Sequence, residues 1–488
     1  MLTKTDFKFY LDCPESIWLL KNKPDVYPQG EFSIFTEKLI KEGYEVESYA
    51  KQLFKNGLDL PEHGGPSQTQ ESLKSSHEVY FQPSFTTNND VFARIDILKR
   101  LEDETWHIYE VKSSTSIKKD RKHRHIEDAC FQKFVLTECG YKVSRVSIVH
   151  LNKEFVKQGD IIASKLLAIT DVTTQVDSIY PTVINQIGSA LKYINKDEIN
   201  QSSCSCKHKT RSNHCDAFSY FNKNIPEYSI YEINRISAKK VSLLVNEEKF
   251  GIKDIPLGFE LNVNQQSQLE SVKQEKPIIN RPNIQRELDK LKFPFHFMDY
   301  ETYSSAVPRL DGLCPHKHLT FQVSIHTLKK DGTVSHFEYL LDKMKMPIDM
   351  LEAMQDFTGT TGTFVSWHAS FEIGRNKELI EWLPQYINYL IYINEHTFDL
   401  ETIFKKDYID YRFHGSSSIK KVLPVLCPDL DYSELDVNNG TMALDTWGRM
   451  VLDQNFDSDI EVTKQNLYDY CRFDTLAMVE IYKTLKKI

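Results

Sequence analysis

Hydrophobic and polar positions alternate with two different periods along this chain, and the changes of period mark the predicted elements. Residues 91–100 (VFARIDILKR) and 106–114 (WHIYEVKSS) alternate like strands around a short turn, which predicts a β-hairpin. Residues 126–139 repeat with helical spacing until Gly140, which predicts a helix and its end. Residues 143–151 (VSRVSIVHL) return to the period of a strand. This succession predicts a mixed α/β unit.

The second half of the chain predicts another α/β unit, joined to the first by a polar helical segment. An apolar strand is predicted at 293–302 (FPFHFMDYET), and a strand, a turn and a helix are predicted at 364–379 (FVSWHASFEIGRNKEL). The amphipathic pattern of 466–482 (NLYDYCRFDTLAMVEIY) predicts a further helix. We therefore expect an α/β protein with domains at 1–225 and 286–488 and a helical connector at 226–285.

The composition is typical of a folded, multidomain protein. The 488 residues exceed the size of a single core, and 40% hydrophobic, 26% charged and 12% aromatic residues exclude a largely disordered chain. No apolar run approaches the roughly 18 to 20 residues of a membrane span. The first ten residues (MLTKTDFKFY) lack the apolar core of an export signal. We therefore expect a cytoplasmic protein with no membrane partner.

Charge and cysteine content narrow the function classes. The net charge of −9 disfavours a protein that coats nucleic acid by charge alone. It does not exclude a metal-dependent nuclease, because such sites need clustered carboxylates. Nine cysteines, an odd number, in a chain without an export signal favour free thiols or metal ligands over a disulfide framework.

The predicted hairpin carries the first group of candidate catalytic residues. Asp96 lies on its first strand, and Glu110 and Lys112 lie two residues apart on its second, so the latter two share one face. Two carboxylates in one pocket can hold Mg²⁺ or Mn²⁺, and an adjacent lysine can stabilise an attacking hydroxide or the developing charge. An isolated E-x-K triplet is more often the solvated face of a hairpin.

The context of this triplet resembles the core of the PD-(D/E)XK nucleases, in their RecB-like branch. An Asp on a strand, a turn, E-V-K on the next strand and a helix that carries Gln132 follow one another in that family's order. The resemblance implies a restriction-endonuclease-like domain at 1–225. Its implied site residues are Asp96, Glu110, Lys112 and Gln132, with Asp96 and Glu110 as metal ligands.

Two neighbouring features bear on that site. The basic segment 118–125 (KKDRKHRH) follows the E-V-K strand, where it either meets incoming phosphates or forms a solvated loop. The RecB-like branch often carries a metal-binding histidine after a glycine of an early helix. Here Gly43 is followed by YEVE, which leaves Glu47 as a substitute ligand.

Four of the cysteines form a pattern of their own. Cys13 stands near the N-terminus, and three more stand in 204–215 (CSCKHKTRSNHC). This layout resembles RecB-like nucleases of CRISPR adaptation, and the resemblance implies a [4Fe–4S] cluster held by Cys13, Cys204, Cys206 and Cys215. Zinc, with help from His208 or His214, is the second interpretation, and three loop thiols without a metal are the third.

A second group of carboxylates lies in the C-terminal half. Asp299 and Glu301 are two apart on a predicted strand, so both face one way, and burying such a pair is costly unless it binds something. Glu372 begins the helix predicted after 364–366. On the last predicted helix, Tyr470 precedes Asp474 by one turn on the same face. A bare D-x-E alone is more often an ordinary charge pair at a strand end.

The order D-x-E, a segment with His368 and Glu372, and Y-x3-D resembles the DEDD exonucleases of the RNase H-like fold, in their tyrosine-bearing subclass. The resemblance implies that Asp299, Glu301, Glu372 and Asp474 bind two divalent cations and that Tyr470 orients the attacking water. Asp399 of FDLETIF matches a strand-end aspartate of that family, and we expect it to be a helix cap or a supporting residue rather than a metal ligand.

The whole chain is similar to a bacterial family of proteins with two nuclease domains, and its implied partner is nucleic acid. The leading hypothesis is a metal-dependent DNA nuclease with a 3′→5′ exonuclease site in the C-terminal domain and a second site in the N-terminal domain. A nucleic-acid-binding scaffold with a decayed N-terminal nuclease is an alternative. An RNA-trimming exonuclease is another, because the residues above do not distinguish DNA from RNA.

Overall fold

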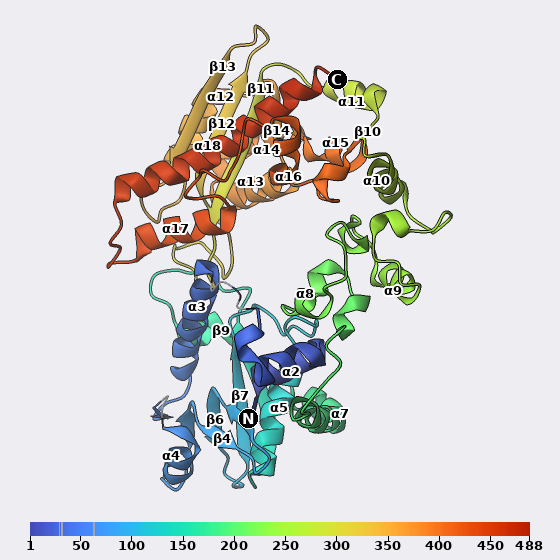
Figure 1. Ribbon diagram of the computed structural model, residues 1–488. Coiled ribbons are helices and arrows are strands. Elements are labelled where there is room, and N and C mark those ends of the chain that lie inside the picture. The colour runs from blue at the N-terminus through green and yellow to red at the C-terminus, as the bar shows by residue number, and fades with distance from the viewer. Residues whose placement is uncertain (29, 31–32, 62–63) are drawn as a thin grey trace. The chain divides into compact units, whose positions relative to one another are not determined.

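The chain folds into two compact units, both of mixed α/β structure as the sequence predicts. The computed structural model describes residues 1–28, 30, 33–61 and 64–488 (Figure 1). Unit 1 comprises residues 1–224 and 305–316, and unit 2 comprises residues 225–304 and 317–488. Two assignments differ from the predicted domains: the predicted connector 226–285 belongs to unit 2, and residues 305–316 belong to unit 1.

Unit 1 is built on a six-stranded sheet of order β2-β3-β6-β7-β8-β9. Strands β6 and β7 are antiparallel, β7 and β8 are parallel, and β8 and β9 are antiparallel. Its strands are β2 (Leu58–Asp59), β3 (Val79–Phe81), β6 (Ile97–Arg100), β7 (Trp106–Lys112), β8 (Val143–Leu151) and β9 (Leu167–Asp171). A second sheet has the order β1-β5-β4 and consists of β1 (Leu2–Thr3), β5 (Val91–Arg94) and β4 (Ser84–Thr86).

The prediction of a single strand at 91–100 is wrong in one respect, because these residues form two strands in two different sheets. Strand β5 pairs with β1 and β4, whereas β6 pairs with β3 and β7. The backbone between them leaves the ladder at Ile95 and Asp96. Asp96 therefore lies one residue before the hairpin rather than on its first strand. The remainder of the hairpin, formed by β6 and β7, is present as predicted.

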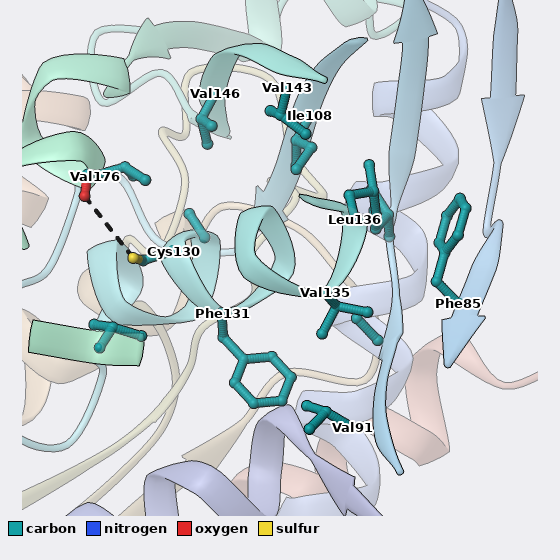
Figure 2. Packing of buried hydrophobic residues seen from close by; sticks show 14 of the residues in the cluster. Phe85, Val91, Ile108, Cys130, Phe131, Val135, Leu136, Val143, Val146 and Val176 are labelled. Carbon is teal, nitrogen blue, oxygen red and sulfur yellow. Dashed lines mark hydrogen bonds between the residues drawn. The ribbon is translucent and has the colours of Figure 1, made fainter. Parts of the chain in front are cut away.

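Helices cover the unit 1 sheet and enclose its largest core. Helix α5 lies between the sheet and α7, and Figure 2 shows Phe131, Val135 and Leu136 of α5 among buried strand residues. Cys130 of α5 is buried and contacts the carbonyl oxygen of Val176 at 3.8 Å, as a core thiol does. The helices of unit 1 are α1 (Lys4–Asp12), α2 (Pro14–Asn22), α3 (Ile34–Lys51), α4 (Gly65–Ser72), α5 (His125–Glu138), α6 (Ala163–Leu166), α7 (Thr173–Ile194) and α8 (Phe218–Phe221).

Residues 305–316 complete a second core of unit 1. Ala306 and Val307 are fully buried in a cluster that contains residues of α3, β3, β7 and β8. Arg309 binds the Glu45 carboxylate of α3 through two hydrogen bonds of 2.7 and 2.6 Å. The ammonium of Lys157 lies 2.5 Å from the carboxylate of Asp311.

Unit 2 is built on a five-stranded sheet of order β13-β12-β11-β14-β15. Its first three strands along the chain are antiparallel neighbours, and β14 and β15 are added in parallel next to β11. Parallel neighbours need crossover connections, which helices of this unit provide. The strands are β11 (Phe295–Tyr303), β12 (Leu319–Leu328), β13 (Val334–Leu340), β14 (Thr363–Ser366) and β15 (Thr397–Asp399).

Helices pack on both faces of this sheet (Figure 1). One face buries Met298 and Tyr300 of β11 against α12 (Ile348–Thr358), α13 (Ser370–Trp382) and α14 (Ile387–Glu395). On the other face, the long helix α18 (Ile460–Leu485) lies across β11 and β12, and α17 (Gly440–Leu452) packs on β11. The predicted helices at 364–379 and 466–482 are α13 and α18.

The predicted connector is helical, and it is built into unit 2. Its helices are α9 (Ala238–Asn246) and α10 (Val263–Gln274), followed by α11 (Arg281–Leu288). Strand β10 (Ile278–Ile279) pairs with β16 (Tyr408–Ile409), close to α15 (Glu401–Lys406) and α16 (Ile419–Leu426). Among the described residues, none of the helices has the length and apolar character that crossing a membrane requires.

Candidate active site

Strand β11 and helix α18 bring three of the predicted carboxylates together in unit 2. Because Met298 and Tyr300 point into the core, Asp299 and Glu301 project from the face that α18 covers. Asp474 of α18 faces them, and one carboxylate oxygen from each of the three residues lies within 4.8 Å of the others. Residues separated by more than 170 positions thus form one acidic cluster.

These carboxylates are held at unusual pKa values. Burial first, and the negative charges of Asp474 and Glu301 next, raise the pKa of Asp299 well above its usual range. Burial and Asp474 do the same for Glu301. Burial raises the pKa of Asp474 to about 6, against hydrogen bonding from Tyr432 and the charge of Lys420. Three mutually repelling carboxylates in a buried place favour either protons or a bound cation.

Glu372 adds a fourth carboxylate near this cluster. It lies in the first turn of α13, is 2% exposed, and its charge contributes to the raised pKa of Asp299. Burial raises the pKa of Glu372 itself to about 8. Its Oε2 atom has no hydrogen-bond partner among the residues that the structure describes. Burying an acceptor without a partner costs free energy of folding unless a ligand binds it.

Three further side chains surround Asp474. The predicted Tyr470 lies one turn before it and is buried, and it helps to lower the pKa of Asp474. Tyr432 also donates its hydroxyl hydrogen to Asp474 Oδ1. The Lys420 ammonium lies 5.2 Å from the ring centre of Tyr432 and 5.6 Å from that of Tyr470. Its charge lowers the pKa of both Asp474 and Glu301.

Asp399 and His368 form a supporting turn beside the carboxylates. Asp399 ends β15, and its Oδ1 accepts hydrogen bonds of 3.1 Å from the backbone N–H groups of His368 and Glu401. The N-cap residue of α15 is Leu400, so Asp399 supports the start of the helix from the preceding position, the second of its two predicted roles. The His368 ring donates from Nδ1 to Glu401 Oε2 at 2.9 Å when that nitrogen is protonated, and its backbone is left-handed with φ of 65°.

The predicted residues of unit 1 also meet, around the buried carboxylate of Glu110. Glu110 Oε1 lies 2.7 Å from Lys112 Nζ, and Oε2 accepts a hydrogen bond from Gln132 Nε2 of α5. Asp96 is half-buried, and its Oδ2 accepts from the Val111 N–H at 2.7 Å. Burial and the charge of Glu110 raise the pKa of Asp96 to about 7. All four predicted side chains therefore belong to one polar network.

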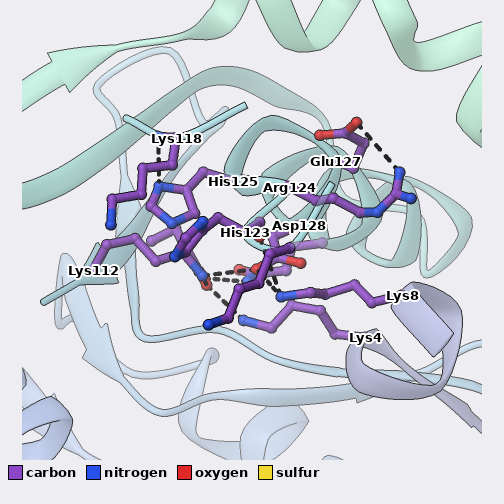
Figure 3. A network of polar contacts seen from close by, with 12 residues as sticks. Lys4, Lys8, Lys112, Lys118, His123, Arg124, His125, Glu127 and Asp128 are labelled. Carbon is purple, nitrogen blue, oxygen red and sulfur yellow. Dashed lines mark hydrogen bonds and ion pairs between the residues drawn. The ribbon is translucent and has the colours of Figure 1, made fainter. Parts of the chain in front are cut away.

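Lysines of helix α1 enter this network, as Figure 3 shows. Lys4 Nζ lies 2.5 Å from Glu110 Oε1, the atom that Lys112 also contacts. Lys112 and Lys8 both reach Asp128 Oδ2, at 2.8 and 3.6 Å. Burial opposes the charge of Glu110, but Lys112 and Lys4 lower its pKa below the usual range. Glu110 and Asp128 are therefore paired with lysines of the protein itself.

The basic segment 118–125 is partly paired within the protein as well. Arg121 and Arg124 bind the Asp12 carboxylate of α1 at 2.6 and 3.0 Å. The His125 ring accepts from the Lys118 N–H at 3.1 Å, and burial lowers the pKa of His125 to about 4. Glu47, the suggested substitute ligand, accepts a hydrogen bond of 2.7 Å from Gln82.

The four predicted cysteines of unit 1 lie together. One Sγ atom from each of Cys13, Cys204, Cys206 and Cys215 lies within 4.8 Å of the others. Cys13 ends α1, and the other three lie in the loop after α7. The second interpretation included His214, but its ring stacks on Phe218 at 3.5 Å between ring centres and its Nε2 meets the Lys209 carbonyl at 3.2 Å.

Four site residues escaped the sequence analysis, namely Lys4, Asp128, Lys420 and Tyr432. Asp128 precedes Gln132 by four residues on α5, so the helical period could have indicated that both face Glu110. Lys420 stands in the segment HGSSSIKKVLPVL, between the predicted elements that carry Glu372 and Asp474. Lys4 and Tyr432 carry no local signal, because only the tertiary fold brings them to the carboxylates.

Comparisons with known proteins add relatives without an assigned activity. A family model described as "Domain of unknown function (DUF2779)" matches residues 296–418, which include Asp299, Glu301 and Glu372. The chain is 25% identical over 297 residues to "Uncharacterized protein UU173" of Ureaplasma parvum, covering 54% of this chain and 42% of that protein.

Two further similarities are partial. The chain is 28% identical over 219 residues to "Uncharacterized protein MG366 homolog" of Mycoplasma pneumoniae, covering 40% of this chain and 33% of that protein. The chain thus aligns with less than half of the length of either curated relative. Among solved structures, "Crystal structure of SSO0001" is 11% identical and covers 38% of this chain and 75% of that chain, with a TM-score of 0.18.

Proposed function

We propose that this protein is a metal-dependent nuclease and that unit 2 shortens DNA from the 3′ end. The observation that carries the proposal is the buried cluster of Asp299, Glu301 and Asp474, whose oxygens lie within 4.8 Å of one another. Their raised pKa values mean that the charge of Lys420 does not offset burial and mutual repulsion, and divalent cations would supply the missing counter-charge. The strand order of unit 2 and the position of Tyr470 agree with the resemblance to DEDD exonucleases.

Asp299, Glu301, Asp474 and Glu372 would hold Mg²⁺ or Mn²⁺ through carboxylate oxygens, the ligands that these ions prefer. Bound divalent cations supply an activated water and stabilise the leaving 3′-oxygen. Tyr432 orients the Asp474 carboxylate through its hydroxyl group. In the substrate complex, the Tyr470 hydroxyl would also fix the attacking water. Lys420 places a positive charge next to Asp474 and Glu301, where it would offset the negative charge of a substrate phosphate.

Unit 1 supports a second, separate phosphodiester-cleaving site at Asp96, Glu110, Lys112 and Gln132. The network around Glu110 contains the carboxylate, lysine and glutamine that the resemblance to RecB-like nucleases implies. There, Lys112 would stabilise developing charge once substrate is bound. This site is part of the proposal, as are DNA as the favoured substrate and a cytoplasmic location.

The test is digestion of end-labelled single- and double-stranded DNA and RNA by the full chain, with Mg²⁺, with Mn²⁺ and with EDTA. We expect stepwise 3′ shortening that EDTA abolishes and that Asp474→Asn reduces by at least about a hundredfold. Asp469→Asn is the matched control, because Asp469 lies on the same helix and bonds to Gln465 at the surface. Adding Lys112→Met to Asp474→Asn should remove any cleavage that the Asp474→Asn variant retains.

The outcomes separate the proposal from its alternatives. Shortening of RNA but not DNA would redirect the proposal to RNA trimming. If the wild-type chain cuts no substrate with either metal, the nuclease proposal fails. Retained binding in EDTA would then favour a nucleic-acid-binding scaffold.

A further inference from the structure

The four-cysteine cluster of unit 1 has a spacing that distinguishes between kinds of metal centre. All four Sγ atoms lie within 4.8 Å of one another. Four thiolates around one tetrahedral ion, with metal–sulfur bonds of about 2.3 Å, lie about 3.8 Å apart. A [4Fe–4S] cluster puts a cube of four irons and four sulfides between its thiolates, and these must then stand much farther apart. The observed spacing fits the single ion and does not fit the cube.

We propose that Cys13, Cys204, Cys206 and Cys215 bind one tetrahedral metal ion of the zinc type, in place of the iron–sulfur cluster that the resemblance implies. Four thiolates are a common ligand set of structural zinc. Cys13, Cys204 and Cys206 are 0 to 2% exposed, and Cys215 is half-buried, so the site is shielded from solvent. A closed site of this kind contributes to folding and not to catalysis.

The surroundings of the sulfurs suit thiolate ligands. Asn222 Nδ2 donates to Cys204 Sγ at 3.3 Å, and Ser205 Oγ lies 3.8 Å from Cys13 Sγ. Donors to sulfur stabilise the negative charge of a bound thiolate. Without metal, the Cys13 thiol donates to Glu15 Oε2 at 3.3 Å. Metal binding would release that proton, together with those of the other thiols that are protonated.

The ion would fasten the N-terminal helices to the loop after α7. Hydrogen bonds already join these segments: Trp18 Nε1 donates to the Lys196 carbonyl at 2.8 Å, Ser205 Oγ donates to Glu15 Oε2 at 2.9 Å, and Lys209 Nζ donates to the Asp12 carbonyl. The ion would add a bond through Cys13 itself. Helix α1, which Cys13 ends, carries Lys4 and Lys8 to Glu110 and Asp128. The metal site would therefore hold α1 in the position that completes the polar network of Figure 3.

The test is the metal content of the full chain purified without oxygen, measured as zinc, iron and acid-labile sulfide per chain. We expect about one zinc, or one iron without sulfide, per chain and its loss in Cys206→Ser. Cys139→Ser is the control, because Cys139 is a partly buried cysteine of the same unit that contacts the Thr86 carbonyl instead. It should retain the ion.

A second measurement covers the case in which Cys206→Ser does not fold. After chelator treatment, the wild-type chain is titrated with Co²⁺, whose visible absorption reports tetrahedral thiolate ligands. With excess Mg²⁺ present to occupy the carboxylates, we expect the thiolate absorption to saturate at one equivalent of Co²⁺ and four thiols to be protected from alkylation. Iron accompanied by an equal amount of sulfide, or the absence of thiolate absorption on addition of Co²⁺, would overturn the single-ion site. This test does not depend on nuclease activity.

Discussion

Buried carboxylates differ between the two units because their counter-charges differ. Burial alone would raise the pKa of Glu110, but the ammonium groups of Lys112 and Lys4 hold it below the usual range. Asp299 meets Asp474 and Glu301 instead, and its pKa rises. At Glu110 the lysines therefore outweigh burial, whereas in unit 2 the charge of Lys420 does not offset burial and the mutual repulsion of the carboxylates. Substitutions that remove single charges should reveal this contrast.

Glu372→Gln should stabilise the metal-free protein at high pH. The pKa of Glu372 is raised from 4.5 to about 8, so its contribution to stability is present below pH 4.5 and is lost as the pH rises through 8. Glutamine cannot ionise. We compare the free energy of unfolding of the variant with that of the wild type, both in EDTA. We expect the difference in favour of the variant to be about 1 to 3 kcal/mol larger at pH 9 than at pH 5, measured by urea unfolding.

The same variant should lose the proposed nuclease activity in the presence of metal, because an oxygen of a proposed metal ligand is replaced by an amide nitrogen. Glu381→Gln is the control, since Glu381 lies exposed on the same helix. An identical pH dependence of stability in wild type and Glu372→Gln would contradict the buried, unpaired state of this carboxylate.

Lys4→Met should tighten divalent cation binding in unit 1. The Lys4 ammonium lies 2.5 Å from Glu110 Oε1 and competes with any cation for that oxygen. In an Asp474→Asn background, we expect Mn²⁺ affinity to rise about tenfold, which equals about 1.4 kcal/mol, by calorimetric titration. Lys8→Met is the control, because Lys8 reaches Asp128 instead. Unchanged Mn²⁺ binding would argue against a cation site at Glu110.

At the scale of elements, the close approach of α17 to β11 depends on a glycine. A Cβ atom on Gly448 would lie 2.4 Å from the Tyr303 ring, and Trp447 beside it packs on Tyr303 and Phe321. The N-terminus of the same helix meets the site, because a Cβ on Gly440 would lie 3.4 Å from Glu301 Oε2. The position of α17 therefore affects both the core and the carboxylates.

Gly448→Ala should destabilise unit 2 by about 1 to 3 kcal/mol, because the added methyl group must displace Tyr303 or the helix. Gly374→Ala in α13 has open space around its Cβ and should stabilise by up to about 1 kcal/mol. Thermal unfolding of the two variants checks the pair. A neutral effect of Gly448→Ala would mean that α17 can shift without cost.

At the scale of the whole molecule, the core of unit 1 depends on residues far along the chain. Val307 is fully buried in a cluster with Val46, Phe81 and Val149. Val307→Ala should lower the stability of unit 1 by about 1.5 to 3 kcal/mol. Hydrogen exchange of β3 and β8 should accelerate. Val334→Ala, at an exposed valine of β13, should leave that exchange unchanged. Equal exchange in both variants would contradict this packing.

The sequence alone determined most elements of the fold and the residue types of both sites. Strands β7, β8 and β11 and helices α5, α13 and α18 follow from local hydrophobic period, and two-residue spacing placed Asp299 beside Glu301. Local pattern could not show that 91–100 divides between two sheets, because a strand's partners are set by distant segments. It also could not assign 305–316 to unit 1.

Only the tertiary structure decided which charges meet. Lys4 reaches Glu110 across 106 positions, Tyr432 reaches Asp474 across 42, and the four cysteine sulfurs converge within 4.8 Å. These contacts determine the sign of each pKa shift and the spacing of the four sulfurs, and neither quantity is encoded in local sequence spacing. The sequence therefore specified the chemical groups, whereas the packing of distant elements specified their distances, and electrostatic and coordination energies depend on distance.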